Sequence, residues 1–294
     1  MNGLITKAII PIAGLATRFL PLSKAISKEL LPVATKPMLQ YALEELRAAG
    51  VDTIVFVVGQ NKKAISDFLH RAPHLEKILE ERKYQDLLSE FQSLEKLLSG
   101  MSFSFVSCPK PLGDGHAVLQ ARKFIGEEAC FVVYPDDIIQ SKVPCSLQLS
   151  QAFKTSQKSV VALCRIPKER ISSYGVVGAE KIATRFWKIK KIVEKPQQEQ
   201  APSDLAMVGR WIVVPEVFEY LRKAKPNKRG EIVLNEVLGE MVKEGKIVYG
   251  YEFEGEWFEC GDRAKWLRSH LAFSLRHPEL GPQLQKFLKE EKLV

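Results

Sequence analysis

Short runs of apolar residues alternate with amphipathic segments along the first part of the chain. Residues 7–12 and 53–58 are nearly unbroken apolar runs, which are typical of strands buried on both faces of a sheet. Residues 38–49 place apolar side chains at helical spacing and precede Gly50, a suitable C-cap, and a second helix is expected over about 62–69. Strands that alternate with helices in this way predict a parallel sheet with helices on both faces.

The pattern is interrupted once and then resumes. Residues 75–98 carry apolar stripes in a charged background, so an inserted helix or helical hairpin, packed on the main body, is expected within about 75–100. The chain shows no internal repeat and no interdomain linker, which predicts one α/β domain over residues 1–294. Further strands are expected at 102–107, 130–134, 159–165, 186–193, 206–214 and 247–253, and further helices at 116–124, 232–244, 263–275 and 282–289, the last two forming a C-terminal helical segment of about 263–291.

Composition narrows the class of protein. The 294 residues are 46% hydrophobic and 27% charged, a balance typical of soluble globular proteins that excludes a disordered chain. No apolar run reaches the ~20 residues of a membrane-spanning helix, and the N-terminal stretch, interrupted by Lys7 and Arg18, lacks the pattern of a signal peptide. Five scattered cysteines without a Cys-x-x-Cys pair argue for free thiols in a reducing compartment. We therefore expect a cytoplasmic protein with no membrane partner.

The net charge of +8 favours an anionic partner. The basic residues are not gathered in one helix or arm, as they are in many nucleic-acid-binding proteins. The densest groups, at 187–192 and 223–229, are typical of a strand with one solvated face and of a polar turn. A small phosphorylated substrate accounts for the charge as well as a polymer does, and we expect no nucleic-acid partner.

The loop after the first strand is the strongest candidate for phosphate binding. It lies beyond the carboxyl end of a strand, where open parallel sheets place their ligands. Ala13 and Gly14 allow close backbone approach, and Arg18, Lys24 and Lys28 follow within eleven positions. The loop lacks the second glycine of a Rossmann fingerprint and the Gly-Lys-Ser/Thr ending of a P-loop. Three cations suit a polyphosphate, although a solvated basic loop would have the same composition.

Two carboxylates, Asp136 and Asp137, directly follow the buried strand 130–134. Magnesium prefers carboxylate oxygens that it shares with substrate phosphates, whereas Pro-Asp-Asp is also an ordinary turn. The neighbouring cationic loop favours metal binding. Residues 113–115 open a helix, where backbone donors can approach a ligand, and residues 194–195 place a carboxylate beside an ammonium group. Each of these last two signals is weak by itself.

Together these motifs resemble a known family. Gly14–Arg18, Lys28-Glu29 and Lys36–Met38 are similar to the signature of the sugar-phosphate nucleotidyltransferases. Later segments narrow the resemblance to the bacterial UTP–glucose-1-phosphate uridylyltransferases: Leu112–Ala117, Pro135–Asp137, Tyr174–Val177, Glu194–Pro196, Ala201–Ala206, Val208–Arg210 and Gly230–Ile232. The resemblance runs from about Lys7 to Trp266. It implies an α/β fold with a Rossmann-like, mixed, mainly parallel sheet flanked by helices.

The resemblance also implies a reaction, in which UTP and glucose 1-phosphate give UDP-glucose and pyrophosphate with Mg²⁺ as cofactor. Arg18 and Lys28 would hold the triphosphate and neutralise the leaving pyrophosphate, and Lys195 would hold the sugar phosphate in line with the α-phosphorus. The attacking phosphate is mostly ionised at pH 7, because its second pKa is ~6, so no general base is needed. The catalytic task is positioning and charge stabilisation.

The remaining roles follow from the same resemblance. Asp136 would coordinate Mg²⁺, with Glu259 or Asp262 as a second ligand. The family implies a homodimer or homotetramer. The nucleotide would be contacted by Ala13, Gly14, Leu15, Glu29, Cys108, Gly115 and Asp136, and the sugar by Gly175, Glu194, Gly209 and Glu231.

The chain departs from the family's pattern at positions near the nucleotide and the metal. Ala16 stands where a glycine is usual, Ser27 where a proline is usual, and Cys108 where a glutamine contacts the uracil. Asp114 replaces a leucine and Glu259 an aspartate. These departures leave open a thymidylyl- or cytidylyltransferase and a catalytically weak, sugar-nucleotide-binding regulatory subunit. A glycosyltransferase would also place acidic residues after a strand, but it has no use for a triphosphate loop.

Overall fold

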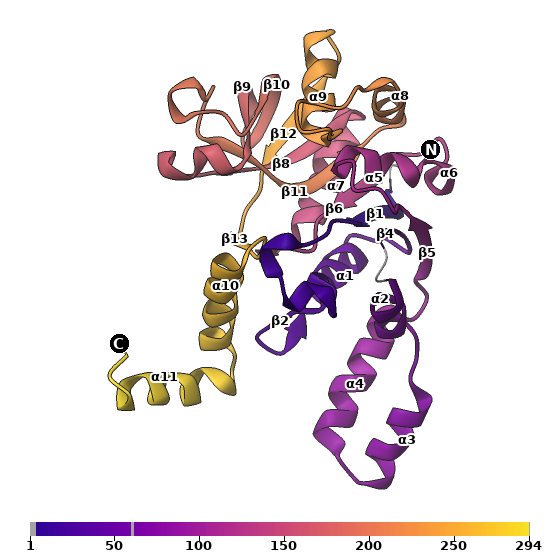
Figure 1. Ribbon diagram of the computed structural model, residues 1–294, viewed down its shortest axis with the longest axis vertical. Coiled ribbons are helices and arrows are strands. Elements are labelled where there is room, and N and C mark those ends of the chain that lie inside the picture. The colour runs from indigo at the N-terminus through magenta and orange to yellow at the C-terminus, as the bar shows by residue number, and fades with distance from the viewer. Residues whose placement is uncertain (1–3, 60–61, 294) are drawn as a thin grey trace.

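The computed structural model describes residues 4–59 and 62–293 (Figure 1). The strands are β1 (Lys7–Ile12), β2 (Pro32–Val33), β3 (Lys36–Pro37), β4 (Thr53–Val58), β5 (Ser102–Ser107), β6 (Cys130–Val133), β7 (Asp137–Gln140), β8 (Ser159–Arg165), β9 (Gly175–Ala183), β10 (Phe186–Glu194), β11 (Leu205–Val213), β12 (Val248–Glu252) and β13 (Glu256–Glu259). The α-helices are α1 (Met38–Ala48), α2 (Lys62–Leu69), α3 (Pro73–Glu81), α4 (Gln85–Leu98), α5 (Asp114–Gln120), α6 (Arg122–Ile125), α7 (Cys145–Ser156), α8 (Glu216–Lys223), α9 (Leu234–Lys243), α10 (Arg263–Arg276) and α11 (Leu280–Glu290).

A mixed sheet with the order β5-β4-β1-β6-β11-β8-β12-β10-β9 forms the centre of the molecule. Strands β5, β4, β1 and β6 are parallel, and so are β8 and β12. Strand β11 runs antiparallel between β6 and β8, and β10 pairs antiparallel with β12 and β9. The mixed α/β fold is confirmed. Parallel pairs do not predominate, however: along the strand order of this sheet, four neighbouring pairs are parallel and four are antiparallel, and β11 also pairs antiparallel with β9.

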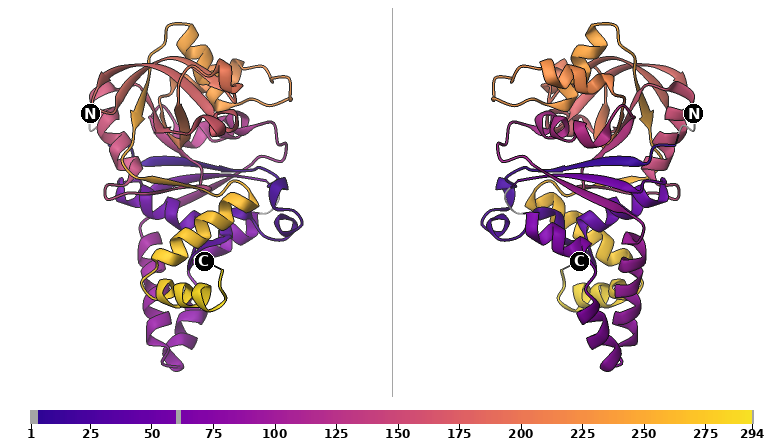
Figure 2. Two further views of the ribbon diagram at one scale, coloured as in Figure 1. Left: turned by 90° about the vertical axis from the view of Figure 1, so that its left-hand side faces the viewer. Right: turned by 90° about the vertical axis from the view of Figure 1, so that its right-hand side faces the viewer.

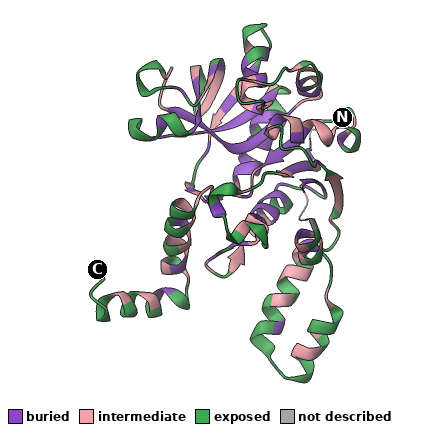
Figure 3. Cartoon of the chain, viewed as in Figure 1, coloured by how far each residue is buried: buried purple, intermediate pink, exposed green. Residues whose placement is uncertain are grey.

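Helices cover both faces of this sheet, as the alternating pattern predicts. In β1, Ile9 faces the core beneath α5, α8 and α9, whereas Ile10 faces the core beneath α1, α2 and α7. Successive strand residues point to opposite faces, so a strand with a core on each side must be apolar throughout. Figure 3 shows the central strands of the sheet buried, whereas β5, β9 and β10 are partly exposed.

Two helical segments project from this body (Figure 1). Helices α3 and α4 form the expected helical hairpin, but most of its side chains are exposed, and α4 is buried only at Leu88 and Leu98 within the described residues. Helices α10 and α11 form the expected C-terminal segment. No helix in the described part of the chain is both long and apolar enough to cross a membrane.

Several elements differ from the sequence prediction. The helix expected at 116–124 begins at Asp114 and is divided into α5 and α6. Helices α7 and α8 and strands β7, β9 and β13 were not predicted. Helix α7 buries the polar residues Ser146 and Gln148, which weakens its apolar periodicity, and β7 and β13 have only four residues each.

Candidate active site

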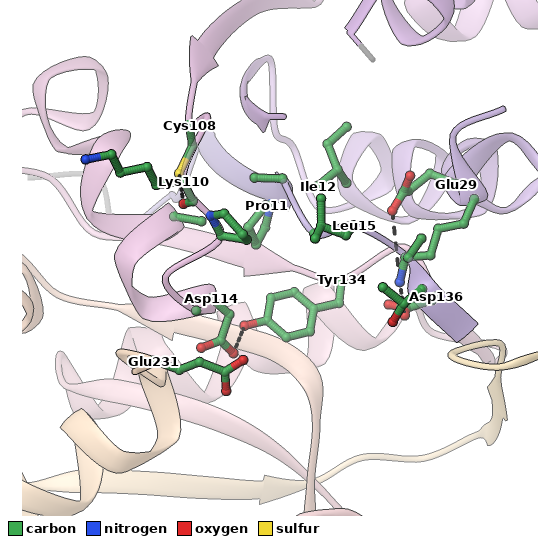
Figure 4. Close-up of a pocket in the computed structure, with 18 residues that line it drawn as sticks. Pro11, Ile12, Leu15, Glu29, Cys108, Lys110, Asp114, Tyr134, Asp136 and Glu231 are labelled. Atoms are coloured by element: carbon green, nitrogen blue, oxygen red, sulfur yellow. Dashed lines mark hydrogen bonds and ion pairs between the residues drawn. The ribbon is translucent and has the colours of Figure 1, made fainter. Parts of the chain in front are cut away.

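Loops that follow β1, β5 and β6 enclose a cavity of about 540 Å³ that we call the main cavity. The loops after β1 and β5 project on the same side of the molecule (Figure 2). A second space of about 420 Å³, the loop cavity, lies beside it and shares the loop after β1. Eight predicted site residues line the main cavity (Figure 4): Ala13, Gly14, Leu15, Lys28, Glu29, Cys108, Asp136 and Glu231.

Lys28 and Asp136 form an ion pair at one end of the main cavity. Lys28 Nζ lies 2.5 Å from Asp136 Oδ2 and 4.0 Å from Glu29 Oε1. Burial by itself would lower the pKa of Lys28, but the two carboxylates outweigh it and the pKa lies above its usual value. Burial would likewise raise the pKa of Asp136, and the attraction of Lys28 holds it below its usual value. Both side chains are therefore charged.

The carboxyl groups beside this pair behave differently. Burial raises the pKa of Glu29, which is only 4% exposed and accepts a hydrogen bond from the Ser27 hydroxyl. Burial, together with the neighbouring charge of Asp136, raises the pKa of Asp137 to about 7. Asp137 accepts hydrogen bonds from Trp257 Nε1 at 2.7 Å and from the Gly209 amide at 3.0 Å. Asp137, in β7, therefore connects to β11 and β13 through hydrogen bonds, and Asp136 is the carboxylate that lines the main cavity.

Arg18, Asp136 and Glu259 converge on Gly261. Arg18 Nη1, Asp136 Oδ2 and Glu259 Oε1 each lie 3.6 to 3.7 Å from the position that a Cβ on Gly261 would take. The pairing of β13 with β7, in which Glu259 lies opposite Asp137, produces this convergence. A cationic loop residue and two carboxylates from distant parts of the chain therefore share one small region.

Both acids proposed as the second metal ligand have protein partners. Glu259 accepts hydrogen bonds from Lys265 Nζ at 2.5 Å, from Arg170 at 3.2 Å and from the Tyr174 hydroxyl. Asp262 Oδ1 accepts from the Lys265 amide at 3.0 Å and caps the N-terminus of α10. Of these three carboxylates, Asp136 alone lines the main cavity, where its ion-pair partner is Lys28.

Asp114 and Tyr134 form a polar wall of the main cavity, and sequence analysis did not predict the contact between them. The Tyr134 hydroxyl donates to Asp114 Oδ2 at 2.5 Å (Figure 4), and Asp114 Oδ1 accepts from the amides of Gly115 and Leu234 at 2.7 and 3.0 Å. Burial raises the pKa of Asp114. This carboxyl group joins the ends of α5, β6 and α9, and both its oxygens have donors. One sign of this arrangement was visible in the sequence, because Asp114 stands where the family has a leucine.

Cys108 lines the main cavity, as its alignment with a base-contacting residue predicts. It is 3% exposed, and its Sγ lies 3.5 Å from His116 Nδ1 and 3.5 Å from the Lys110 carbonyl oxygen. Burial raises the pKa of the thiol. Cys108 is therefore a neutral, weakly polar group at this wall. All five cysteines are free thiols.

Glu194, Lys195 and Glu231 lie at the other end of the site, around a side cavity of about 220 Å³. Asn235 Nδ2 donates to Glu194 Oε2 at 3.0 Å, and Lys195 Nζ lies 3.3 Å from Glu194 Oε1. A Cβ on Gly175 would lie 2.7 Å from Asn235 Nδ2 and 2.9 Å from Glu194 Oε2, so a larger residue would displace the ends of these two side chains. Lys195 has a φ of +47°, a conformation that is uncommon for a residue with a side chain.

Two predicted glycines have a packing position instead of lining these cavities. A Cβ on Gly115 would lie 2.9 Å from the Ile232 carbonyl oxygen, so this glycine lets α5 approach the loop before α9. A Cβ on Gly209 would lie 2.4 Å from Asp137 Oδ2 and 2.9 Å from Tyr134 Cβ. Gly115 therefore allows close packing of backbone segments, and Gly209 leaves room for the Asp137 side chain.

A buried ion pair supports the loop that carries Asp136. Arg210 is 1% exposed and contacts both carboxylate oxygens of Glu45 at 2.9 to 3.1 Å. Its other donor group reaches the carbonyl oxygens of Tyr134 and Gly209 at 2.8 Å. Ser146 donates to Glu45 from both its amide and its hydroxyl, at 2.9 and 2.6 Å. The pair therefore fixes the backbone just before Pro135 and Asp136.

Comparison with known proteins identifies the class to which this fold and site belong. The model of the nucleotidyl transferase family matches residues 7–273, so the chain belongs to the nucleotidyl transferase family. The UTP–glucose-1-phosphate uridylyltransferase of Staphylococcus haemolyticus is 37% identical over 286 residues, which are 97% of this chain and 98% of that protein. The enzyme of the same name from Bacillus subtilis is 36% identical over 285 residues, which are 97% of this chain and 96% of that protein. The resemblance to the bacterial uridylyltransferases is thus confirmed.

Solved structures agree with this assignment. A crystal structure of a UDP-glucose pyrophosphorylase in complex with UDP-glucose superposes with a TM-score of 0.85 at 34% identity, covering 93% of this chain and 100% of that one. A UTP-bound UGPase from Acinetobacter baumannii gives a TM-score of 0.87 at 31% identity, covering 97% of this chain and 99% of that one. Both the family model and the solved structures therefore confirm the nucleotidyltransferase fold.

Proposed function

We propose that this chain transfers a uridylyl group from UTP to glucose 1-phosphate. A phosphate oxygen of the sugar 1-phosphate attacks the α-phosphorus, the bond from that phosphorus to the bridging oxygen of the β-phosphate breaks, and pyrophosphate leaves. UDP-glucose is the second product. No proton transfer is required, because the attacking phosphate is already ionised. The observation that carries the proposal is the charged pair of Lys28 and Asp136 in a cavity lined by the loop after β1.

The charges in and beside the main cavity support one orientation of the substrates. Lys28 and Arg18 lie near Asp136 at one end, Asp114 and Glu231 line the other, and Glu194 lines the adjoining side cavity. Cations stabilise the charge that develops on a leaving pyrophosphate, and carboxylates accept hydrogen bonds from sugar hydroxyl groups. We infer that Lys28 and Arg18 hold the triphosphate, that Lys195 holds the sugar phosphate, and that Glu194 and Glu231 bind the glucose.

The donor set fits a magnesium ion. The described residues contain no cluster of three or more acidic, histidine or cysteine side chains able to hold a metal by themselves. Magnesium commonly takes only one or two carboxylates and completes its coordination with substrate phosphates and water. We propose that Asp136 holds Mg²⁺, with Glu259 as a second ligand only if it exchanges its partner Lys265. The bound ion would neutralise phosphate charge.

The proposed preference for UTP has an alternative, in which the site also accepts another nucleoside triphosphate. Cys108 stands at the cavity wall where the family has a glutamine, and both oxygens of Asp114 already have protein donors. We therefore infer that neither side chain forms a strong hydrogen bond with the polar edge of the uracil. Use of thymidine triphosphate as a secondary substrate is the second candidate function that this observation favours.

A pyrophosphate-release assay tests the proposal directly. The purified chain is supplied with each of the four ribonucleoside triphosphates and thymidine triphosphate, combined with glucose 1-phosphate or another sugar 1-phosphate. UTP with glucose 1-phosphate should give the highest kcat/KM, and pyrophosphate with UDP-glucose should give the reverse reaction. Absence of pyrophosphate release with every combination would support a regulatory, non-catalytic subunit instead.

Three further properties belong to the proposal. Residues 1–294 form a single nucleotidyltransferase domain, and the protein works in the cytoplasm, which agrees with its free thiols. A homodimer or homotetramer is supported by large apolar side chains exposed on the projecting helices, such as Leu267, Leu271 and Phe287, which are 58%, 41% and 50% exposed. Analytical ultracentrifugation would determine the oligomeric state.

A further inference from the structure

The loop between α8 and α9 carries two cations that the proposed function has not used. Lys228 and Arg229 line the side cavity together with Glu194 and Lys195, and Glu231 lines both this cavity and the main cavity. The loop projects on the same side as the loops after β1 and β5 (Figure 2). Lys228 and Arg229 therefore face the space that the proposed function assigns to the sugar 1-phosphate.

Hydrogen bonds of Asn227 hold this loop in one shape. The Asn227 amide donates to the Glu231 carbonyl oxygen at 2.8 Å, and Asn227 Oδ1 accepts from the amides of Arg229 and Glu231 at 2.9 and 3.2 Å. Asn227 Nδ2 donates to Glu236 at 3.0 Å. The side chains of Lys228 and Arg229 are exposed, and neither forms an ion pair within the described residues. The hydrogen bonds of Asn227 therefore hold the loop backbone in place, and among the described residues Lys228 and Arg229 have no ion-pair partner.

The charge of the side cavity explains why cations are needed there. Its lining contains three carboxylates, Glu194, Glu231 and Glu236. With Lys195 as the only cation the formal charge of the lining would be −2, and Lys228 and Arg229 bring it to zero. A sugar 1-phosphate carries a charge between −1.5 and −2 at pH 7 and would be repelled by the lining without the loop cations.

We propose that Lys228 and Arg229 are binding residues for the phosphate of the sugar 1-phosphate. Carboxylates accept hydrogen bonds from the hydroxyl groups of the sugar but repel its negatively charged phosphate. The two loop cations offset that repulsion. Together with Lys195, which lines the same cavity, they hold the anion. This assignment rests on the proposed function and concerns its second substrate only.

The experiment compares Lys228→Met, Arg229→Met and the double variant with Lys223→Met. Lys223 is an exposed cation at the end of α8 that lines a different cavity, so its variant loses the same charge outside the site. Each single loop variant should raise KM for glucose 1-phosphate about tenfold, with KM for UTP changed less than about twofold. The increase should shrink at high ionic strength, and Arg229→Lys should restore most of the lost affinity.

The outcomes separate this inference from the proposed function. An unvaried protein that makes no UDP-glucose would contradict the proposed function. If it is active and the double variant matches Lys223→Met in KM for glucose 1-phosphate, the inference is wrong while the proposed function stands. An equal rise in both KM values would also refute it, because the loop would then act on the whole site. Thermal denaturation of every variant checks that the fold is retained.

Discussion

Replacement of Lys28 by methionine tests the central pair of the site. Methionine keeps an unbranched, apolar side chain and removes the charge that lies 2.5 Å from Asp136 and 4.0 Å from Glu29. Two effects are expected. The leaving pyrophosphate loses a cation, so kcat falls. Asp136 loses the partner that holds its pKa down, so burial dominates and its pKa rises above the usual value.

The size of the first effect follows from the burial of the pair. Both side chains are about one-fifth exposed, so the lost interaction is only partly screened by water. Removal of one preorganised contact to developing charge costs about 2.7–4 kcal/mol, which corresponds to a loss in kcat of order 10²–10³. KM for glucose 1-phosphate should change far less, because Lys28 is assigned to the triphosphate.

Steady-state kinetics over a range of pH measures both effects. Because an ionised Asp136 is needed for metal binding, the acid limb of the pH profile should move to higher pH in Lys28→Met, and Mg²⁺ affinity measured by calorimetry should weaken over the same range. The matched control is Lys36→Met, which breaks the more exposed 2.8 Å pair of Lys36 with Glu44. The reasoning is refuted if Lys28→Met keeps kcat within about threefold of the unvaried protein with an unchanged acid limb.

Three other predictions address the metal, the base and the support of the site. Asp136→Asn should abolish activity with the fold retained, since the amide lacks the charge that Mg²⁺ requires; full activity in excess chelator would contradict the metal assignment. Cys108→Gln should increase the preference for UTP over thymidine triphosphate by a factor corresponding to about 1–3 kcal/mol, and an unchanged ratio of kcat/KM values would place Cys108 outside base recognition. Glu45→Ala should destabilise the protein by about 3–5 kcal/mol in urea unfolding, because it leaves Arg210 buried without a counterion, and a loss below about 1 kcal/mol would count against this account.

The sequence by itself determined the fold class and the chemistry at the strand ends. Short apolar runs such as 7–12 and 53–58 are typical of strands with a core on each side, and β1 and β4 have these bounds. The cationic loop and Asp136 were located because open sheets bind ligands at the carboxyl ends of strands. Both signals are local, since periodicity and position after a strand are read from neighbouring residues.

The tertiary structure alone decided which of these groups meet. Lys28 and Asp136 are 108 positions apart, and Arg210 and Glu45 are 165 apart. Asp114 replaces a leucine near the nucleotide site, and its oxygens accept hydrogen bonds from Tyr134 and two backbone amides. Partners of this kind are set by strand order and by how closely loops approach, which depend on packing of the whole chain. The pattern of apolar and polar residues indicates which face of a strand or helix a side chain occupies. The charged groups that the side chain meets there belong to elements distant in sequence.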